Sequence, residues 1–340
     1  MKSIVALDFA IYLAPYALKC LVIIDVAAFA AALQSIFEIY SRSLPLFFYN
    51  AYRYLRGISF SYGFYIVQIA PIFTNFSNSC YNTNMLKEEL YQEIYERYGF
   101  VSRARNCFLY THKGVRLTDL FQENGKAILG WDGKNSTTFF KNMLSKGLTG
   151  GFICEDSPRV DKAVSELIEK NCKVSFYINK AEAVKVAVSA GAQNIVSYKP
   201  WNKEQEDLGA ADAVVIIPPF PWGEDIVILA LADRTAVQGL TIPFALQTAL
   251  TRSIYNLIAE LPLRQEKDWF IYDTILTKYW KRKGPYLYPK ITENKYDEFV
   301  KHCLECSIVI NPSYKEPSII PFGADKGVFT KLKNNPFEEK

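Results

Sequence analysis

Between residues 157 and 231, apolar strand-like runs alternate with amphipathic helical segments, and this alternation restricts the chain to few folds. One helix is expected to begin at Ser157-Pro158, where serine suits the cap and proline the first helical position. A second helix is expected over 181–190. The expected strands are 174–178, 194–198, 213–217 and 226–231. The alternation predicts an α/β fold with a mainly parallel sheet and helices on both of its faces.

The segments flanking this region predict two further units. Leu86, Leu90, Ile94 and Tyr98 share one helical face, and Lys113-Gly114 reads as the turn of a hairpin. Near the end of the chain, one helix is expected to turn a stripe inward, formed by Tyr296, Phe299, Val300, Cys303 and Leu304. We therefore expect a large domain within 85–285 and a small α+β domain over 286–340.

Residues 1–84 form an apolar extension, expected to be helical, with five basic and three acidic residues. The run from Gly57 to Leu86 contains no charge, and Ile58–Phe76 is long enough to cross a bilayer at about 1.5 Å per residue. Three alternatives stay open: a membrane hairpin or anchor, a cleaved signal peptide, and an extension from an upstream start codon. In the last case Met85 is the true start.

Charge and cysteine content exclude some classes of protein. A chain of 340 residues buries a large core, and its net charge of +4 is spread along the sequence, which makes nucleic acid a poor partner. The seven cysteines are an odd number at irregular intervals, as expected of reduced thiols in the cytoplasm. Cys303 and Cys306 stand beside His302, but no second ligand pair follows, so we expect core packing and no metal site.

Several motifs, in order, resemble the class III aminotransferases of the fold-type I pyridoxal-phosphate family. None is specific alone, and the likeness covers most of residues 97–335. The motifs are Arg103-Ala104-Arg105, Leu109-Tyr110, Gly114, Leu117–Leu120, Ile128–Gly130, Phe176–Ala183, Gly284–Pro289 and Val309–Ser318. The resemblance implies a reduced fold-type I large domain with a small C-terminal domain, and a dimer, because the sites of such enzymes form between subunits.

The departures from the family pattern concern its cofactor site. Asn179-Lys180 stands where the family carries a Ser-Gly phosphate turn; Lys180 would attract a phosphate, whereas Asn179 also suits a helix cap. Only 28 residues separate Ala183 from Asp212, which leaves little room for the family's central segment. Neither Asp212 nor Asp233 is assigned as the partner of the pyridine nitrogen.

Lys146 lies in the string SKGLTGG, which is similar to the family's aldimine loop. The family lysine follows almost the whole large-domain sheet, however, whereas Lys146 precedes it. We therefore interpret Lys146 as a solvated lysine beside a turn and keep it as the alternative catalytic residue.

The leading hypothesis is a degenerate, non-catalytic aminotransferase-like protein with a binding or structural role and no bound cofactor. The alternatives are an active pyridoxal-phosphate aminotransferase or aminomutase, and a protein-interaction module anchored in the membrane by residues 1–84. A homodimer stays open as a partner, and the ligand is not assigned.

Overall fold

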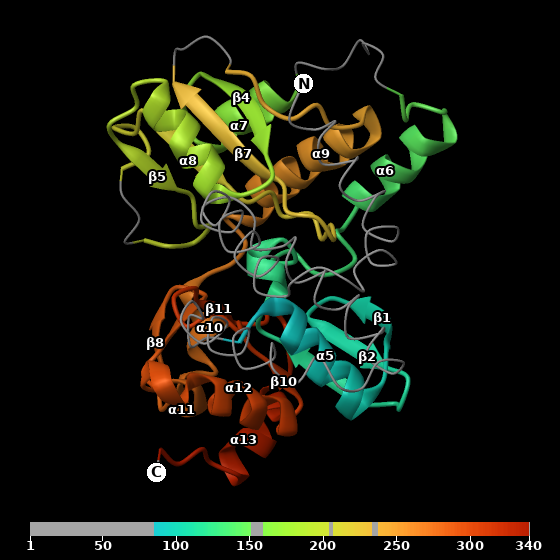
Figure 1. Cartoon of the computed structure of the whole chain (residues 1–340), viewed down its shortest axis with the longest axis vertical. Helices are drawn as coiled ribbons and strands as arrows, with labels where there is room; N and C mark the ends of the chain where they lie inside the picture. Colours follow the sequence, from blue (N-terminus) through green and yellow to red (C-terminus); the bar gives the residue numbers. More distant parts are fainter. Residues whose placement is uncertain (1–84, 151–158, 204–206, 233–236, 340) are drawn as a thin grey trace, which may run out of the picture. The chain divides into compact units, whose positions relative to one another are not determined.

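The structure is a computed structural model that describes residues 85–150, 159–203, 207–232 and 237–339 (Figure 1). The extension over 1–84 and Asp233 lie outside the described residues. The α-helices are α5 (Lys87–Tyr98), α6 (Ser136–Ser145), α7 (Arg159–Leu167), α8 (Lys180–Ser189), α9 (Phe244–Glu260), α10 (Glu266–Phe270), α11 (Asp273–Leu276), α12 (Tyr296–Glu305) and α13 (Thr330–Asn334). The 3-10 helices are η1 (Gln122–Gly125), η2 (Glu293–Lys295) and η3 (Lys326–Phe329).

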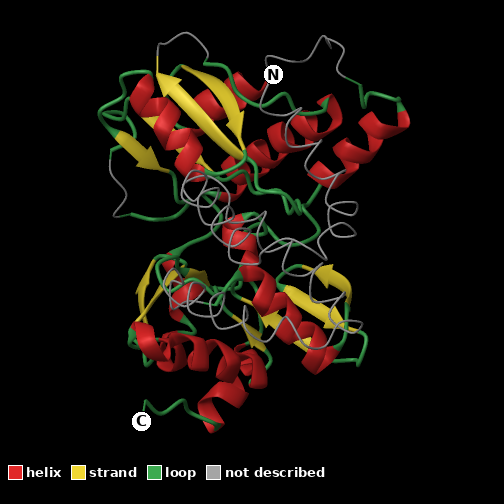
Figure 2. Cartoon of the chain, viewed as in Figure 1, coloured by secondary structure: helices red, strands yellow, loops and turns green. Residues whose placement is uncertain are grey.

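The strands, yellow in Figure 2, form three sheets with the orders β4-β7-β6-β5, β1-β2-β3-β10 and β11-β9-β8. The strands are β1 (Val101–Arg105), β2 (Phe108–Thr111), β3 (Arg116–Asp119), β4 (Cys172–Tyr177), β5 (Ile195–Ser197), β6 (Ala213–Ile216), β7 (Val227–Ala232), β8 (Trp280–Lys283), β9 (Tyr286–Pro289), β10 (Ile308–Val309) and β11 (Ser318–Ile319). Strands and helices therefore coexist as the α/β prediction required.

The prediction of a mainly parallel sheet is wrong for the sheet β4-β7-β6-β5. Its β5–β6 pair is parallel, but β7 runs antiparallel to both β4 and β6. The connection from β6 to β7 spans only 217–226 and holds no helix, and a short connection of this kind suits antiparallel neighbours. A central antiparallel strand buried on both faces has the same continuous apolar sequence as a parallel one, so the sequence did not reveal its direction.

Helices do cover both faces of this sheet, as predicted. Alternate residues of β6 and β7 point to opposite sides, as the pleat of a strand requires. Val214, Ile216, Ile228 and Ala230 pack in one core with α7 and α9. On the other face lies α8 (Figure 1), and Val215 and Leu229 belong to a core with its Ala183 and Ala187, which are fully buried.

The sheet β1-β2-β3-β10, which we call the hairpin sheet, shares its core with the C-terminal part of the chain. Strand β3 pairs in parallel with β10, and the surrounding core holds Leu117, Trp280 and Phe329. The predicted inward stripe of α12 is confirmed, since all five of its residues are buried. Among the described residues, none of the helices combines the length and apolar character of a membrane span.

Candidate functional site

The carboxyl ends of β4, β5 and β6 meet at one edge of the sheet, and open α/β sheets bind ligands at such edges. In this chain the edge is packed with side chains. Phe220, Tyr286, Ile319 and Leu129 are buried there in the same core as α7 and α9. Trp222 stacks on Phe220 with ring centroids 6.3 Å apart.

Among the lysines that the structure describes, Lys126 is the buried one. Its side chain reaches this edge from the end of η1. Its Nζ donates to the carbonyl oxygens of Trp222 at 2.9 Å and Glu224 at 3.4 Å, and to Asp225 Oδ1 at 2.8 Å. Glu123 Oε2 also lies 3.5 Å from the Lys126 Nζ. The ammonium therefore finds acceptors for all three of its protons.

The backbone before Lys126 takes an uncommon path. Gln122, Glu123 and Asn124 all have positive φ values, of 47°, 50° and 59°, which side-chain-bearing residues rarely adopt. Side chains hold the strained turn in place: the Tyr91 hydroxyl donates to Glu123, and Lys87 pairs with the same carboxylate. The sequence pattern that marks Lys126 is only a lysine in a glycine-flanked apolar run, which is too weak to predict its burial.

Asp119 supports the same turn from the end of β3. Its Oδ1 accepts hydrogen bonds from the backbone N–H groups of Phe121 at 2.9 Å and Gln122 at 3.0 Å, and its Oδ2 accepts from Trp131 Nε1 at 2.7 Å. Burial raises the pKa of the Asp119 carboxyl from 3.8 to about 6, although these three hydrogen bonds act against the rise.

A second lysine, Lys199, follows β5 at the same edge. Its Nζ lies 5.6 Å from the ring centroids of both Tyr286 and Tyr288, and 3.4 Å from the Tyr288 hydroxyl. Burial raises the pKa of the neighbouring Tyr198 to about 12, so its hydroxyl keeps its proton at neutral pH. The edge thus places the Lys199 side chain close to two aromatic rings.

Lys146 lies away from this arrangement. It is the exposed C-cap of α6, followed by Gly147 with a φ of 75°, and its Nζ has no hydrogen-bond or ion-pair partner among the described residues. The string SKGLTGG therefore ends a helix and begins a turn, up to the point where the description stops at residue 150.

Asn179 and Lys180 begin α8, and both are exposed. The Asn179 side chain caps the helix, because its Oδ1 accepts the backbone N–H of Glu182 at 2.7 Å. A helix N-terminus attracts an anion through its free N–H groups, and here one of those groups is already satisfied. The first turn also carries the acidic Glu182.

Asp212 stands at the opposite edge of the sheet, ahead of β6. Its Oδ2 accepts the backbone N–H groups of Gln193 at 2.9 Å and Asn194 at 3.0 Å. This carboxylate therefore stabilises the loop before β5.

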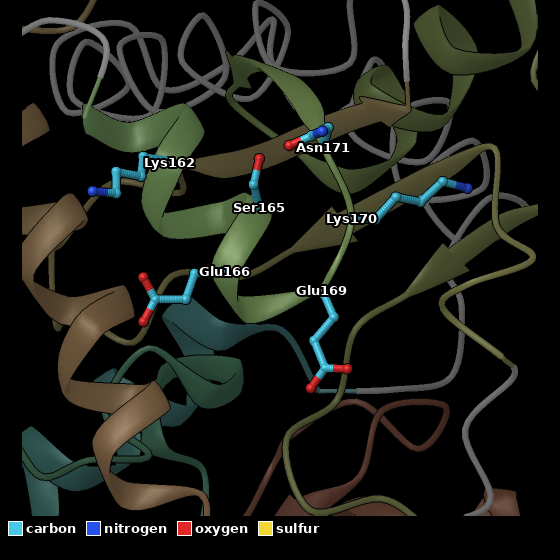
Figure 3. Close-up of a pocket in the computed structure, with 6 residues that line it drawn as sticks. All are labelled: Lys162, Ser165, Glu166, Glu169, Lys170 and Asn171. Atoms are coloured by element: carbon cyan, nitrogen blue, oxygen red, sulfur yellow. The ribbon is translucent and has the colours of Figure 1, made fainter.

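Two hollows of the described surface also lie away from the carboxyl edge. One, of about 360 Å³, is lined by the end of α7 and the turn before β4, and its labelled side chains point in different directions (Figure 3). Its Lys170 is already bound to the carbonyl oxygens of Gly209 and Ala211. The other, of about 380 Å³, lies beside Ile271, Tyr272 and Phe322.

The cysteine pair of α12 packs in the core. Cys303 is fully buried, and burial raises the pKa of its thiol well above the usual value. His302 Nε2 lies 2.9 Å from the Asn335 carbonyl oxygen and 4.0 Å from Cys306 Sγ. Within the described ranges, no three histidine, cysteine or acidic side chains gather as metal ligands would.

Comparison with known sequences finds uncharacterised relatives. No family model matches the chain. An uncharacterized protein of Treponema pallidum is 27% identical over 286 residues, which cover 68% of this chain and 92% of the relative. An uncharacterized protein of Borreliella burgdorferi is 21% identical over 248 residues, covering 71% and 91%.

Solved aminotransferases share the fold. Ornithine aminotransferase from Plasmodium yoelii matches with a TM-score of 0.54 at 12% identity, over 73% of this chain and 97% of that one. Acetylornithine aminotransferase from Elizabethkingia anophelis matches with a TM-score of 0.52 at 12% identity, over 73% and 98%. The resemblance to class III pyridoxal-phosphate aminotransferases is therefore confirmed at the level of fold.

Proposed function

We propose that this chain is an aminotransferase-fold protein that does not catalyse transamination and has a binding or structural role. The supporting observation is the state of the lysines at the carboxyl edge. An imine forms when a neutral amine attacks a carbonyl carbon. The Lys126 amine is a buried ammonium donating to three acceptors, and the Lys199 amine lies between two tyrosine rings.

The residues at the start of α8 also do not fit a phosphate-bearing cofactor. Asn179 occupies the helix cap with its own side chain, and the carboxylate of Glu182 repels an anion from the first turn. Fold alone does not imply activity, so the likeness to aminotransferases leaves this proposal open to test.

Absorbance spectroscopy of the purified chain with added pyridoxal phosphate tests the proposal. We expect no aldimine band and, after borohydride reduction, no cofactor adduct at Lys126, Lys146 or Lys199 by peptide mass spectrometry. A band that disappears in Lys146→Ala or Lys126→Met and changes on addition of an amino donor would instead establish the alternative, an active aminotransferase.

The dimer and the membrane anchor remain predictions. Light scattering on the full chain measures the first, and cell fractionation measures the second. A full-length chain found wholly in the soluble fraction would contradict the anchor.

A further inference from the structure

The hairpin sheet carries an uneven share of the charge. Residues 99–118 contain four basic residues and no acidic one. The net charge of this segment is therefore +4, the same as the net charge of the whole chain. The basic residues are Arg103, Arg105, Lys113 and Arg116.

Strand pairing places the three arginines on one face of the hairpin sheet. Arg103 pairs with Tyr110, and Tyr110 pairs with Arg116, so these residues form a row across β1, β2 and β3. Arg105 pairs with Phe108 in the next row on the same face, since residues two apart in a strand point the same way. We call these five residues the arginine face.

The opposite face of the same strands is core. Leu109 and Leu117, which pair with each other, are 5% and 0% exposed. The arginine face is therefore the solvent side of a sheet whose other side is fixed, and its geometry does not depend on a flexible loop.

The arginines of this face make no ion pair within the part of the chain that the structure describes. Arg103, Arg105 and Arg116 are exposed, and none of them forms an ion pair with a carboxylate of the described residues. Two of the guanidinium groups cover aromatic rings instead: Arg116 lies 4.5 Å from the Phe108 ring centroid and Arg103 lies 5.6 Å from that of Tyr110. Guanidinium groups held this way present donors suited to phosphate oxygens.

The covered rings favour a phosphate surface over a nucleic acid. Single-stranded nucleic acids gain much of their affinity by stacking bases on open aromatic rings, but here guanidinium groups already lie over those rings. At the start of β1, Phe100 and Val101 are 53% and 41% exposed. Apolar side chains beside basic ones suit the boundary between lipid headgroups and acyl chains.

The sequence before the hairpin supports the same partner. The uncharged run Gly57–Leu86 ends 15 positions before Val101, and the intervening α5 is 12 residues, or about 18 Å, long. Helix α5 itself holds four glutamates against Lys87 and Arg97, so the attraction to anionic lipids rests on the arginine face. We propose that the arginine face binds the phosphate-bearing headgroups of an anionic membrane surface.

Vesicle cosedimentation of the full chain tests this assignment. The measured quantity is the ratio of binding to phosphatidylcholine vesicles with and without phosphatidylserine, because an apolar anchor contributes to both. Replacing Arg103, Arg105 and Arg116 by glutamine should lower this ratio roughly 100-fold, since each charge contributes about a fivefold factor near such a surface. High salt should abolish the preference in the parent chain.

Matched variants separate this face from net charge. Lys141→Gln, Lys185→Gln and Lys281→Gln together remove the same charge from exposed positions and should leave the ratio within about twofold. Replacing the three arginines by lysine should keep most of the preference, which shows that positive charge at these positions carries it. An equal fall in the control, an unchanged ratio in the arginine variant, or binding to single-stranded oligonucleotides in place of vesicles would each overturn the proposal.

Discussion

The ammonium of Lys126 lies 2.8 Å from the carboxylate of Asp225, across 99 positions of sequence. The contact fastens the loop between β6 and β7 to the left-handed turn that follows β3. The Lys126 Nζ shares its protons among the acceptors of this loop. Lys126 is thus a structural residue at a place where the fold would accommodate chemistry.

Lys126→Met should destabilise the chain by roughly 2 to 3 kcal/mol, because hydrogen bonds to a charged group contribute about 1.5 to 3 kcal/mol and the Trp222 carbonyl loses its donor. Urea unfolding followed by tryptophan fluorescence measures the change. Lys141→Met, at an exposed position, is the control and should stay within about 0.5 kcal/mol. A Lys126 variant as stable as that control would show that the pair contributes nothing.

The sequence predicted the helices and strands between residues 157 and 231 because each has a period that its burial imposes. It did not predict the direction of β7, since an apolar run buried on both faces reads the same either way. Lys126 escaped prediction for a related reason. Two of its acceptors are backbone carbonyls, 96 and 98 residues away, and a backbone carbonyl leaves no trace in the identity of its residue.

Asn179→Ala should cost about 1 kcal/mol, because the N–H of Glu182 loses the side chain that caps α8. Asn179→Asp should retain the cap and most of the stability. Thermal unfolding of the two variants, each with and without inorganic phosphate, also tests the residue's role. If phosphate stabilises the parent chain but not Asn179→Ala, the residue serves an anion site and the capping interpretation is wrong.

Gly284→Ala should destabilise the chain by about 3 kcal/mol. Gly284 has a φ of 54°, and a Cβ added there would lie 2.6 Å from the Trp201 carbonyl oxygen, so left-handed strain adds to a clash with backbone. Gly147 has a φ of 75° with nothing within 4 Å of an added Cβ. Gly147→Ala therefore isolates the strain and should cost about 1 kcal/mol. Equal losses in both variants would contradict the clash.

The candidate site was predicted only where local sequence decides the structure. Asn179 precedes a helix, and its cap follows from its own side chain and the next turn. Lys146 is exposed at the end of α6, and the prediction of a solvated lysine came from its position in the chain, before the sheet, and not from its local string. The arginine face required strand register, which brings Arg103 and Arg116 to the two sides of Tyr110.

Asp119 should make the stability of the chain depend on pH. Its pKa rises from 3.8 to about 6 on folding, so the folded state binds the proton more tightly than the unfolded state. The resulting stabilisation is complete below about pH 4 and is lost as the pH rises through 6, by about 3 kcal/mol in total. Asp119→Asn removes the titration while keeping an acceptor for the N–H groups of Phe121 and Gln122. Urea unfolding between pH 4 and 7 should therefore show a free energy of unfolding that falls with pH in the parent chain and falls less in Asp119→Asn. Asp132→Asn controls for the removal of one carboxylate. Parallel profiles for the parent and Asp119→Asn would assign the pH dependence to other groups.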